Sequence, residues 1–379
     1  MKVLLFRTNG NKLDITKYNS QEIGLAKALR RKGIECDIAY YTNEDSNIQE
    51  LPFCNESIRI YWLKGKSIAG NGFFGNIDSI LEQYNVIQVS EYDQITSLRL
   101  AFFSKFKNKT VIYHGPYLTE FNKKYRQKCR IIDCIPLSKK RKQTIQCFAK
   151  SILAKDFLQD RGFSNILVTG VGLDIERLII SDNVSGGVKS LIESMKNHFS
   201  LLYIGNIEPR RNTLFLIRIM KILSDDNPDI QLIIVGEGNE SYKKDCEQEI
   251  DRLGLKERII IHNRVPQNEV SHLYKAANVF LLPSSYEIYG MVMMESMYYG
   301  LPVITTKSGG SMTVIEDGKN GFIIKLEEQK WAECILRLYH NSILCTQIGN
   351  EARKTILDKF TWDGIAEKMI EKYVMICRS

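Results

Sequence analysis

Two glutamates, Glu287 and Glu295, lie in the part of the sequence with the most potential for chemistry. An apolar strand ending at Leu282 precedes them, and the pattern predicts a helix that begins after Gly290 and ends at Gly300. Because this helix is apolar on every side, we expect it to be buried together with Glu295. An unpaired buried carboxylate is costly, so Glu295 needs a partner, either a ligand hydroxyl or a buried arginine.

The start of this helix is a candidate anion site. Helix N-termini present free backbone N–H groups and a partial positive charge, and Gly290 would let a phosphate approach the amides of Met291 and Val292 closely. Glu295 lies five residues beyond Gly290, which is about 7.5 Å along the axis at roughly 1.5 Å per residue. A nucleotide with its phosphates at Gly290 would therefore place its ribose on Glu295, and Glu287 would face the group attached to the terminal phosphate.

The elements that must position these side chains alternate between strands and helices along the chain. This order predicts an α/β protein built from two Rossmann-like units. The polar stretch Leu173–Ser200, which contains Ser185-Gly186-Gly187, is interpreted as the connection between them. Strands are predicted at Lys2–Phe6, Glu35–Tyr41, Ile58–Leu63, Val86–Ser90, Thr110–Tyr113 and Ile166–Thr169, then at Leu201–Ile204, Ile230–Val235, Ile259–His262 and Val279–Leu282.

Strand ends supply further candidate residues, because the carboxyl ends of parallel strands line the ligand crevice of open α/β sheets. His114 follows the strand Thr110–Tyr113 directly. A lone histidine is more often structural than catalytic, so both roles stay open for His114 on position alone. Gly236 and Gly238 could start a dinucleotide-binding loop, but Ser241 stands where the third glycine belongs, so no nicotinamide cofactor is expected.

A family resemblance emerges from the residues around Glu287 and Glu295. They form the pattern E-x-Y-G-x4-E, with Pro283-Ser284 before it and Gly300-Leu301-Pro302 after it. This resembles the donor-site signature of the retaining, GT-B-fold glycosyltransferases of family 4 (glycosyl transferases group 1), and the similarity extends over nearly the whole chain. It implies two Rossmann-like domains that face each other across a cleft: residues 1–175, completed by a C-terminal helix 363–379 that crosses back, and residues 176–362.

The resemblance also implies roles for individual residues. The expected catalytic residues are His114, Glu287 and Arg211. Arg211 stands where the family has a phosphate-clamping lysine and can grip a phosphate bidentately, whereas Asn206 stands where the family has an arginine. The expected donor-binding residues are Glu295, Gly290, Met291, Val292, Gly205, Asn206, Arg210, Arg264 and Val265. No metal and no cofactor is expected, since the helix start and Arg211 would meet the leaving-group charge.

Positive charge is concentrated between Phe121 and Lys150. Ten basic residues and a single acid, Asp133, give this window a charge of +9, against +8 for the whole chain. Interleaved apolar residues favour an anionic membrane surface or a lipid-pyrophosphate acceptor over a solvated face, and no nucleic-acid-binding module accompanies them. The acceptor or membrane residues predicted here are Lys123, Lys124, Lys139, Lys140, Arg141 and Lys142.

Composition indicates the class of protein and its cellular compartment. A charged fraction of 25% and a hydrophobic fraction of 44% are ordinary for a globular protein, and no apolar run reaches the length of a membrane span. The nine cysteines are odd in number and scattered, which favours reduced thiols in a cytoplasm. We therefore expect a cytoplasmic protein, with a peripheral position on the inner face of the cell membrane.

The expected function is transfer of a sugar, with retention, from a nucleoside-diphosphate sugar such as a UDP-sugar to a hydroxyl. The expected acceptor is a glycan or lipid-linked glycan in bacterial surface polysaccharide synthesis. Two alternatives stay open. One is a nucleotide-sugar epimerase or hydrolase on the same fold, and the other is a non-catalytic polybasic membrane-binding protein.

Overall fold

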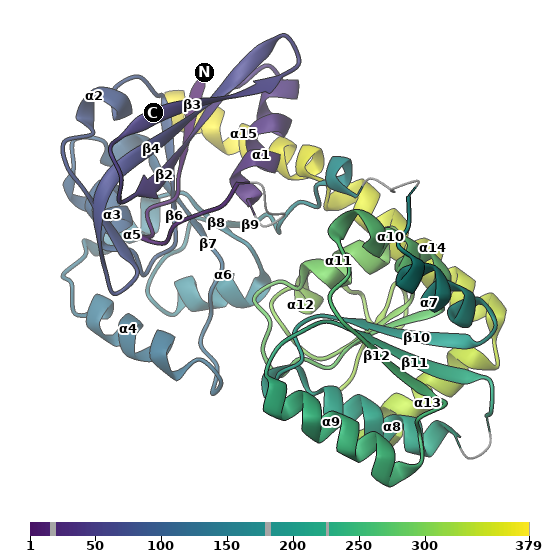
Figure 1. Cartoon of the computed structure of the whole chain (residues 1–379). Helices are drawn as coiled ribbons and strands as arrows, with labels where there is room; N and C mark the ends of the chain where they lie inside the picture. Colours follow the sequence, from purple (N-terminus) through teal and green to yellow (C-terminus); the bar gives the residue numbers. More distant parts are fainter. Residues whose placement is uncertain (16–19, 179–182, 225–226, 379) are drawn as a thin grey trace. The chain divides into compact units, whose positions relative to one another are not determined.

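The computed structural model describes residues 1–378 apart from 16–19, 179–182 and 225–226. The chain divides into two compact units (Figure 1). The first unit consists of Met1–Gly172 and Phe360–Ser379, and the second of Leu173–Lys359. The end of the sequence therefore belongs to the same unit as its beginning.

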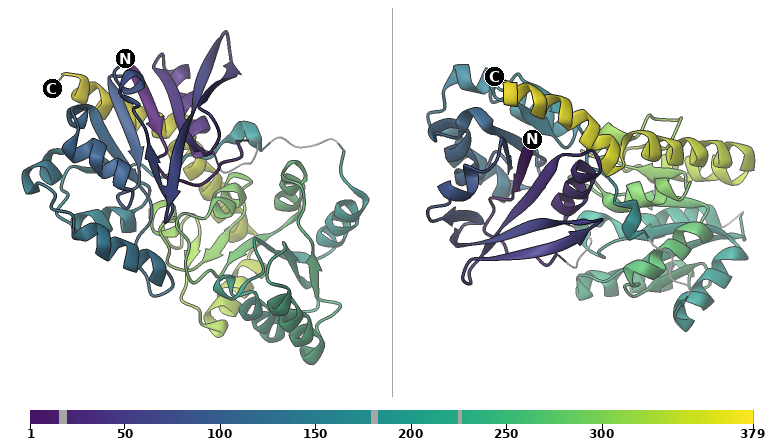
Figure 2. Two further views of the ribbon diagram at one scale, coloured as in Figure 1. Left: turned by 60° about the vertical axis from the view of Figure 1, so that its left-hand side comes forward. Right: turned by 90° about the horizontal axis from the view of Figure 1, so that it is seen from above.

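The first unit is built on a nine-stranded sheet in the described part of the chain, in the order β3-β4-β2-β1-β6-β7-β8-β9, with β5 paired to β4. Neighbouring strands are parallel except for β3 with β4 and β4 with β5, and Figure 2 shows the β3–β4 hairpin projecting from the sheet. The strands are β1 (Lys2–Phe6), β2 (Glu35–Thr42), β3 (Asn47–Phe53), β4 (Glu56–Ile68), β5 (Asn71–Phe74), β6 (Val86–Ser90), β7 (Thr110–His114), β8 (Cys147–Ala149) and β9 (Ile166–Val168).

Short helices and turns connect these strands. Between β6 and β7, a single α-helical turn is followed directly by a π-helical segment, Arg99–Phe103. The helices of the unit are α1 (Gln21–Arg31), α2 (Asp78–Leu81), α3 (Ile95–Leu98), α4 (Lys123–Asp133), α5 (Lys139–Thr144), α6 (Ile152–Gln159) and α15 (Trp362–Arg378), with a 3-10 turn at Lys107–Lys109.

Helix α15 completes the first unit by packing along α1, as the purple and yellow helices in Figure 1 show. Its buried Trp362 lies so close to Gly24 of α1 and to Gly172 that a Cβ at either glycine would overlap the indole. Deeper in the unit, the buried Tyr373 hydroxyl donates to the side-chain oxygen of Gln88 on β6 at 2.6 Å. The predicted return of the C-terminal helix to the first domain is confirmed.

The second unit has a six-stranded sheet in its described residues, all parallel, in the order β12-β11-β10-β13-β14-β15. Its central strands are buried along their whole length, as expected for a parallel sheet covered on both faces. The strands are β10 (Phe199–Ile204), β11 (Ile230–Val235), β12 (Ile259–His262), β13 (Val279–Leu282), β14 (Val303–Thr305) and β15 (Phe322–Ile323).

Helices cover both faces of this sheet, with α8 and α9 on one side and α10 and α11 on the other (Figure 1). The helices are α7 (Gly186–Lys196), α8 (Thr213–Ser224), α9 (Glu240–Leu253), α10 (Gln267–Ala276), α11 (Met291–Tyr298), α12 (Ser311–Val314), α13 (Glu328–Tyr339) and α14 (Ser342–Lys359), with 3-10 turns at Ile175–Arg177 and Pro209–Arg211.

The interpretation of Leu173–Ser200 as a connection is wrong for much of its length. Residues 186–196 form helix α7, and β10 already begins at Phe199. The glycine pair after Ser185 lies in the first turn of α7, and Val188, Leu191 and Met195 form its buried face. Strands β3 and β5 and helices α4 and α5 were not predicted either.

None of the helices in the described residues is both long enough and apolar enough to cross a lipid bilayer.

Candidate functional site

The second unit brings Arg211 and Glu287 together from two adjacent strands. Strands β10 and β13 run parallel, with Leu201 opposite Val279. The 3-10 turn that holds Arg211 follows β10, and the loop that holds Glu287 follows β13. Since carboxyl ends of neighbouring parallel strands meet at one edge, the two side chains form an ion pair there.

Arg211 is only partly satisfied by its contacts. One guanidinium nitrogen pairs with Glu287 and also donates to the Ser284 hydroxyl at 3.0 Å. The side chains of Arg211 and Glu287 are each 16% exposed. The Arg211 Nε is buried and lies 3.8 Å from a carboxylate oxygen of Glu208, but it makes no hydrogen bond to the described residues. An anion arriving here would therefore meet a guanidinium with an unused donor.

The neighbouring residues have structural roles. Arg210 donates to the Tyr286 carbonyl at 2.8 Å and pairs with Glu208 at 2.6 Å, so it fastens the loop before α11. Asn206 is exposed, and its carbonyl accepts a hydrogen bond from the Tyr203 hydroxyl at 2.7 Å.

Glycines let the loops after β10 and β11 approach each other. A Cβ on Gly236 would overlap the carbonyl oxygen of Gly205, and a Cβ on Gly238 would overlap that of Ile207. Gly236 and Gly238 thus serve loop-to-loop packing, and Gly205 provides the backbone that lies against it.

Helix α11 begins where the sequence predicted. Gly290 is its N-cap residue and has a φ of +83°, a conformation that favours glycine. The next two residues, Met291 and Val292, are half-buried, and their amides belong to the first turn, which lacks intrahelical partners. The remainder of the helix is buried up to Met297, so the prediction of a buried helix is confirmed except at its two ends.

Glu295 is 3% exposed in the middle of α11. Its Oε2 accepts a hydrogen bond from the Tyr274 hydroxyl at 2.9 Å, and the Tyr274 ring stacks on Tyr299 at 5.5 Å between centroids. The ligand role of Glu295 stays a prediction. After β12, Arg264 is exposed and Val265 is 4% exposed. Their predicted role beside a ligand stays a prediction.

The first unit places His114 at the end of β7, fully buried. Its ring stacks on Phe157, with centroids 4.7 Å apart. The Nδ1 atom lies 3.1 Å from a carboxylate oxygen of Glu91, whereas the buried Nε2 has no partner among the described residues. Buried polar atoms are nearly always paired, so Nε2 is an open hydrogen-bonding position.

Glu91 links three strand ends. Its second carboxylate oxygen pairs with Lys150 Nζ at 2.9 Å, just after β8. Burial alone would raise the pKa of Glu91, but the positive charge of Lys150 and the contact with His114 lower it well below its usual value. Glu91 is therefore ionised at any physiological pH.

Glu91, Asp93 and His114 each offer an atom within 4.8 Å of the others, a spacing that could suit a metal ion. However, Lys150 pairs with Glu91 at 2.9 Å and Lys128 pairs with Asp93 at 2.6 Å. These two ammonium groups already neutralise the carboxylates and would repel a cation, so the donor set does not favour a metal.

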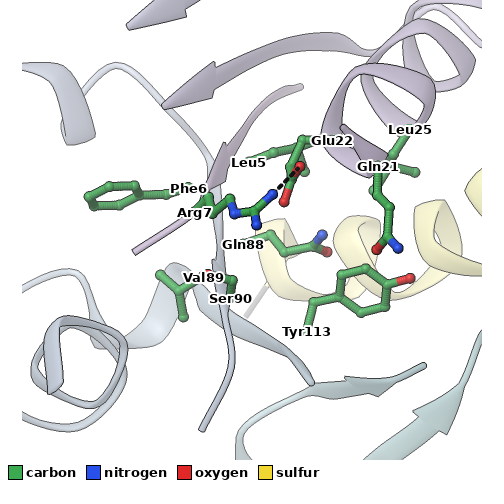
Figure 3. Close-up of a pocket in the computed structure, with 10 residues that line it drawn as sticks. All are labelled: Leu5, Phe6, Arg7, Gln21, Glu22, Leu25, Gln88, Val89, Ser90 and Tyr113. Carbon is green, nitrogen blue, oxygen red and sulfur yellow. Dashed lines mark ion pairs between the residues drawn. The ribbon is translucent and has the colours of Figure 1, made fainter. Parts of the chain in front are cut away.

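A small pocket lies beside the ends of β1 and β6 in the first unit (Figure 3). Arg7 and Glu22 form an ion pair across it at 3.7 Å, drawn as a dashed line. Gln21, Gln88 and Tyr113 also line it. The pocket combines an apolar floor with groups that can bind hydroxyls.

The basic window forms helices α4 and α5, and four of its predicted residues are exposed, namely Lys123, Lys124, Lys139 and Lys140. Arg141 behaves differently, because its guanidinium donates to the carbonyls of Ala101, at 3.2 Å, and Lys107. Lys142 is half-buried over the Phe163 ring. The Arg141 side chain therefore has a structural role and is not part of the exposed basic surface on α4 and α5.

The sequence analysis assigned no site role to Glu91, Lys150 or Tyr274. Local sequence does not show that Lys150 pairs with Glu91, which lies 59 residues away in the sequence. It likewise does not show that Tyr274 binds Glu295, which lies 21 residues away.

Taken together, two α/β units with parallel sheets match the fold of GT-B glycosyltransferase structures over the whole chain. Anabaena HepE in complex with UDP superposes with a TM-score of 0.72 at 19% identity, covering 99% of this chain and 100% of that one.

Residues 190–355 match the family model described as glycosyl transferases group 1, a segment that includes Arg211, Glu287 and Glu295 but not His114. An uncharacterized glycosyltransferase of Methanocaldococcus jannaschii is 31% identical over 46% of this chain and 44% of its own length. A UDP-Gal:alpha-D-GlcNAc-diphosphoundecaprenol alpha-1,3-galactosyltransferase of Escherichia coli is 25% identical over 59% of this chain and 57% of its own. The chain spans about half the length of the curated relatives it matches.

Proposed function

We propose that this protein is a retaining, metal-independent glycosyltransferase of family 4 that moves a sugar from a UDP-sugar to the hydroxyl of a glycan or lipid-linked acceptor. The observation that carries the proposal is the meeting of Arg211, Glu287 and the Gly290 helix start at one edge of the second sheet. The family match covers this edge, and the similar Anabaena structure holds UDP.

Each group at this edge has a task in such a reaction. The first turn of α11 and Arg211 would stabilise the negative charge that develops on the departing diphosphate. Binding of the donor would draw Arg211 from Glu287 toward phosphate, leaving Glu287 to accept hydrogen bonds from sugar hydroxyls. Glu295, which already accepts a hydrogen bond from the Tyr274 hydroxyl, would also bind the ribose hydroxyls.

The acceptor would enter through the first unit. The pocket beside Arg7 and Glu22 offers an ion pair and a glutamine, Gln88, to hydroxyl groups over an apolar floor. The pocket is small, so such a lining suits a single hydroxyl group at the edge of an acceptor sugar. The name of the Escherichia coli relative describes transfer to a diphosphoundecaprenol-linked sugar, which supports a lipid-linked acceptor in surface polysaccharide synthesis.

The test is to incubate the purified protein with a panel of nucleotide-sugars and detect released nucleoside diphosphate by mass spectrometry, with and without candidate acceptors. Arg211→Ala should lower the rate by orders of magnitude, because the diphosphate loses the guanidinium that is predicted to clamp it. The matched control is Arg252→Ala, because the Arg252 side chain is 66% exposed and pairs with Glu249 on the same helix at 2.7 Å.

Three outcomes would count against the proposal. Full activity of Arg211→Ala would show that Arg211 does not clamp the diphosphate. Isomerised donor without transfer would favour the epimerase alternative, and an inverted anomeric signal in the product NMR spectrum would exclude retention. EDTA is expected to leave the rate unchanged.

A second candidate activity is reversible binding to an anionic membrane, which would be compatible with a lipid-linked acceptor. Four exposed lysines lie on α4 and α5, and Phe121 and Ile131 beside them are 52% and 73% exposed. Each basic residue near an anionic surface contributes about 1 kcal/mol, screened within a Debye length. Exposed apolar side chains would add to this attraction.

Liposome co-sedimentation tests the membrane proposal. Binding should require anionic lipid, fall with added salt and disappear when Lys123, Lys124, Lys139 and Lys140 are replaced by serine. The control replaces four exposed lysines of the second unit, Lys244, Lys256, Lys319 and Lys330. Equal pelleting with neutral vesicles, or equal loss in both variants, would exclude a specific basic surface.

A further inference from the structure

Three neighbouring strands of the first sheet each end in a charged or titratable residue, and these residues form one chain of contacts. Glu91 follows β6, His114 ends β7, and Lys150 follows β8. The two oxygens of Glu91 are divided between its neighbours. One lies 2.9 Å from Lys150 Nζ, and the other lies 3.1 Å from His114 Nδ1 and accepts the Gly115 N–H at 2.8 Å.

The backbone is shaped for this arrangement. Glu91 has a φ of +63°, which is unfavourable for a residue with a side chain, and its N–H donates to the Tyr113 carbonyl at 3.0 Å. Lys150 lies over Gly115, where a Cβ would come within 2.6 Å of the lysine Cδ. An unfavourable backbone conformation like that of Glu91 persists only where the surrounding contacts enforce it. These contacts therefore fix the position of the Glu91 carboxylate.

Two groups compete for His114 Nδ1. The Glu91 carboxylate at 3.1 Å requires a proton on Nδ1, whereas the Tyr92 N–H at 3.2 Å points to the same atom as a donor and requires a lone pair. A hydrogen bond to an ionised oxygen is roughly twice as strong as a neutral one. In addition, an Nδ1 lone pair would face an ionised oxygen. The carboxylate therefore decides the tautomer.

We propose that Glu91, itself fixed by Lys150, is a positioning residue that holds His114 as the Nδ1–H tautomer and presents Nε2 as a hydrogen-bond acceptor for a ligand hydroxyl. The buried Nε2 has no partner among the described residues, as an acceptor awaiting a donor would. That the hydroxyl belongs to the transferred sugar rests on the proposed function. The tautomer itself does not.

The first test is NMR of the whole protein labelled with 15N-histidine. Long-range 1H–15N correlations distinguish the protonated ring nitrogen from the unprotonated one, and His114→Gln identifies the His114 signals among the five histidines. The neutral ring of the unaltered protein is expected to carry its proton on Nδ1. A proton on Nε2 would overturn the proposal without any variant of Glu91.

The second test uses Glu91→Gln, which keeps the shape of the side chain and removes its charge. The Tyr92 N–H then prevails, and the His114 proton is expected to move to Nε2. Lys128→Gln is the control, because it breaks a similar lysine–carboxylate pair, with Asp93 at 2.6 Å, next to the site. An unchanged tautomer in Glu91→Gln, or the same change in Lys128→Gln, would exclude Glu91 as the cause.

A kinetic arm connects the network to catalysis. Once a donor is identified, Glu91→Gln should lower kcat by about 10–100-fold, the range seen for carboxylates that orient metal-bound histidines, while UDP affinity stays constant. An equal loss of UDP affinity would assign Glu91 a structural role instead. If no nucleotide-sugar is turned over at all, the proposed function fails, whereas the NMR spectra still decide the role of Glu91.

Discussion

At the scale of single residues, the buried Glu295 gives a direct test of nucleotide binding. If its carboxylate binds ribose hydroxyls, Glu295→Ala should weaken UDP binding by about 1–3 kcal/mol, the cost of a lost hydrogen bond to a charged group. Isothermal titration calorimetry measures this change. The variant also leaves the Tyr274 hydroxyl without the acceptor it has at 2.9 Å.

Tyr274→Phe is the matched comparison for Glu295→Ala, because it removes the same internal hydrogen bond and keeps the carboxylate. Its affinity for UDP should fall far less than that of Glu295→Ala. Similar losses in both variants would mean that the Glu295–Tyr274 pair stabilises α11 and that ribose binds elsewhere.

Glu91 should make the stability of the protein depend on pH. Its pKa is well below the usual value in the folded state, despite burial, because of Lys150 and His114. A lowered folded-state pKa contributes stability that is complete above the unfolded pKa of about 4.3 and is lost as the pH falls further. Glu91→Gln should therefore be less stable than the original protein at neutral pH, and the difference should narrow below about pH 4.

Urea unfolding at a series of pH values, followed by fluorescence, measures this difference. A gap that stays constant or widens on acidification would show that the Glu91 carboxylate is not held ionised by its neighbours.

The residues of the candidate site divide into those that the sequence could reveal and those that it could not. Glu287, Gly290 and Glu295 lie within one helix and its preceding loop, so local spacing fixes their relation. Glu91 and Lys150 are brought together by strand order, which no local pattern encodes. The same holds for Arg211, whose role was expected but whose pairing with Glu287 was not.

At the scale of elements, the contact between α1 and α15 reverses the usual effect of a helix glycine. Replacing an interior glycine by alanine normally stabilises a helix by up to about 1 kcal/mol. At Gly24 the added Cβ would overlap the buried Trp362 indole, and overpacking costs about 1–3 kcal/mol. Gly24→Ala should therefore destabilise the protein, as measured by the thermal midpoint.

Gly186→Ala provides the control for Gly24→Ala. This glycine is in the first turn of α7 and has open space where a Cβ would stand. It should be neutral or slightly stabilising. Stabilisation by Gly24→Ala would show that Trp362 does not pack there.

Elements with continuous apolar runs were predictable, and those with mixed composition were not. Strands β11 and β13 are buried along their length, and their sequences are unbroken runs of strand-forming residues apart from Gln231. Strand β3 is largely exposed and includes Pro52, so its residues lack the alternation that marks a strand. It is held instead by antiparallel pairing with β4.

At the scale of the whole molecule, the last helix is required by the first unit. Removal of residues 360–379 would uncover the surface on which Ile365, Met369 and Tyr373 are buried. The shortened protein should lose hydrogen-exchange protection in β1 and β6 while β10 and β11 keep theirs. Mass spectrometry of exchanged peptides makes the comparison.

Removing only residues 377–379 is the control for that truncation, since Cys377 is exposed and the buried residues of α15 lie before it. Protection should then be unchanged throughout. Equal loss in both units after the longer truncation would mean that the units do not fold independently.

The split of the first unit between both ends of the sequence has a consequence during synthesis on the ribosome. Residues 1–172 emerge first, but their partner α15 is made only after the entire second unit. At about 5–20 residues per second, the nascent first half waits roughly 10–40 s with the α1 surface uncovered. The second unit, which is continuous, can fold during that wait. We therefore expect a vectorial order in which the part made first is finished last, and in which chaperones bind the early segment.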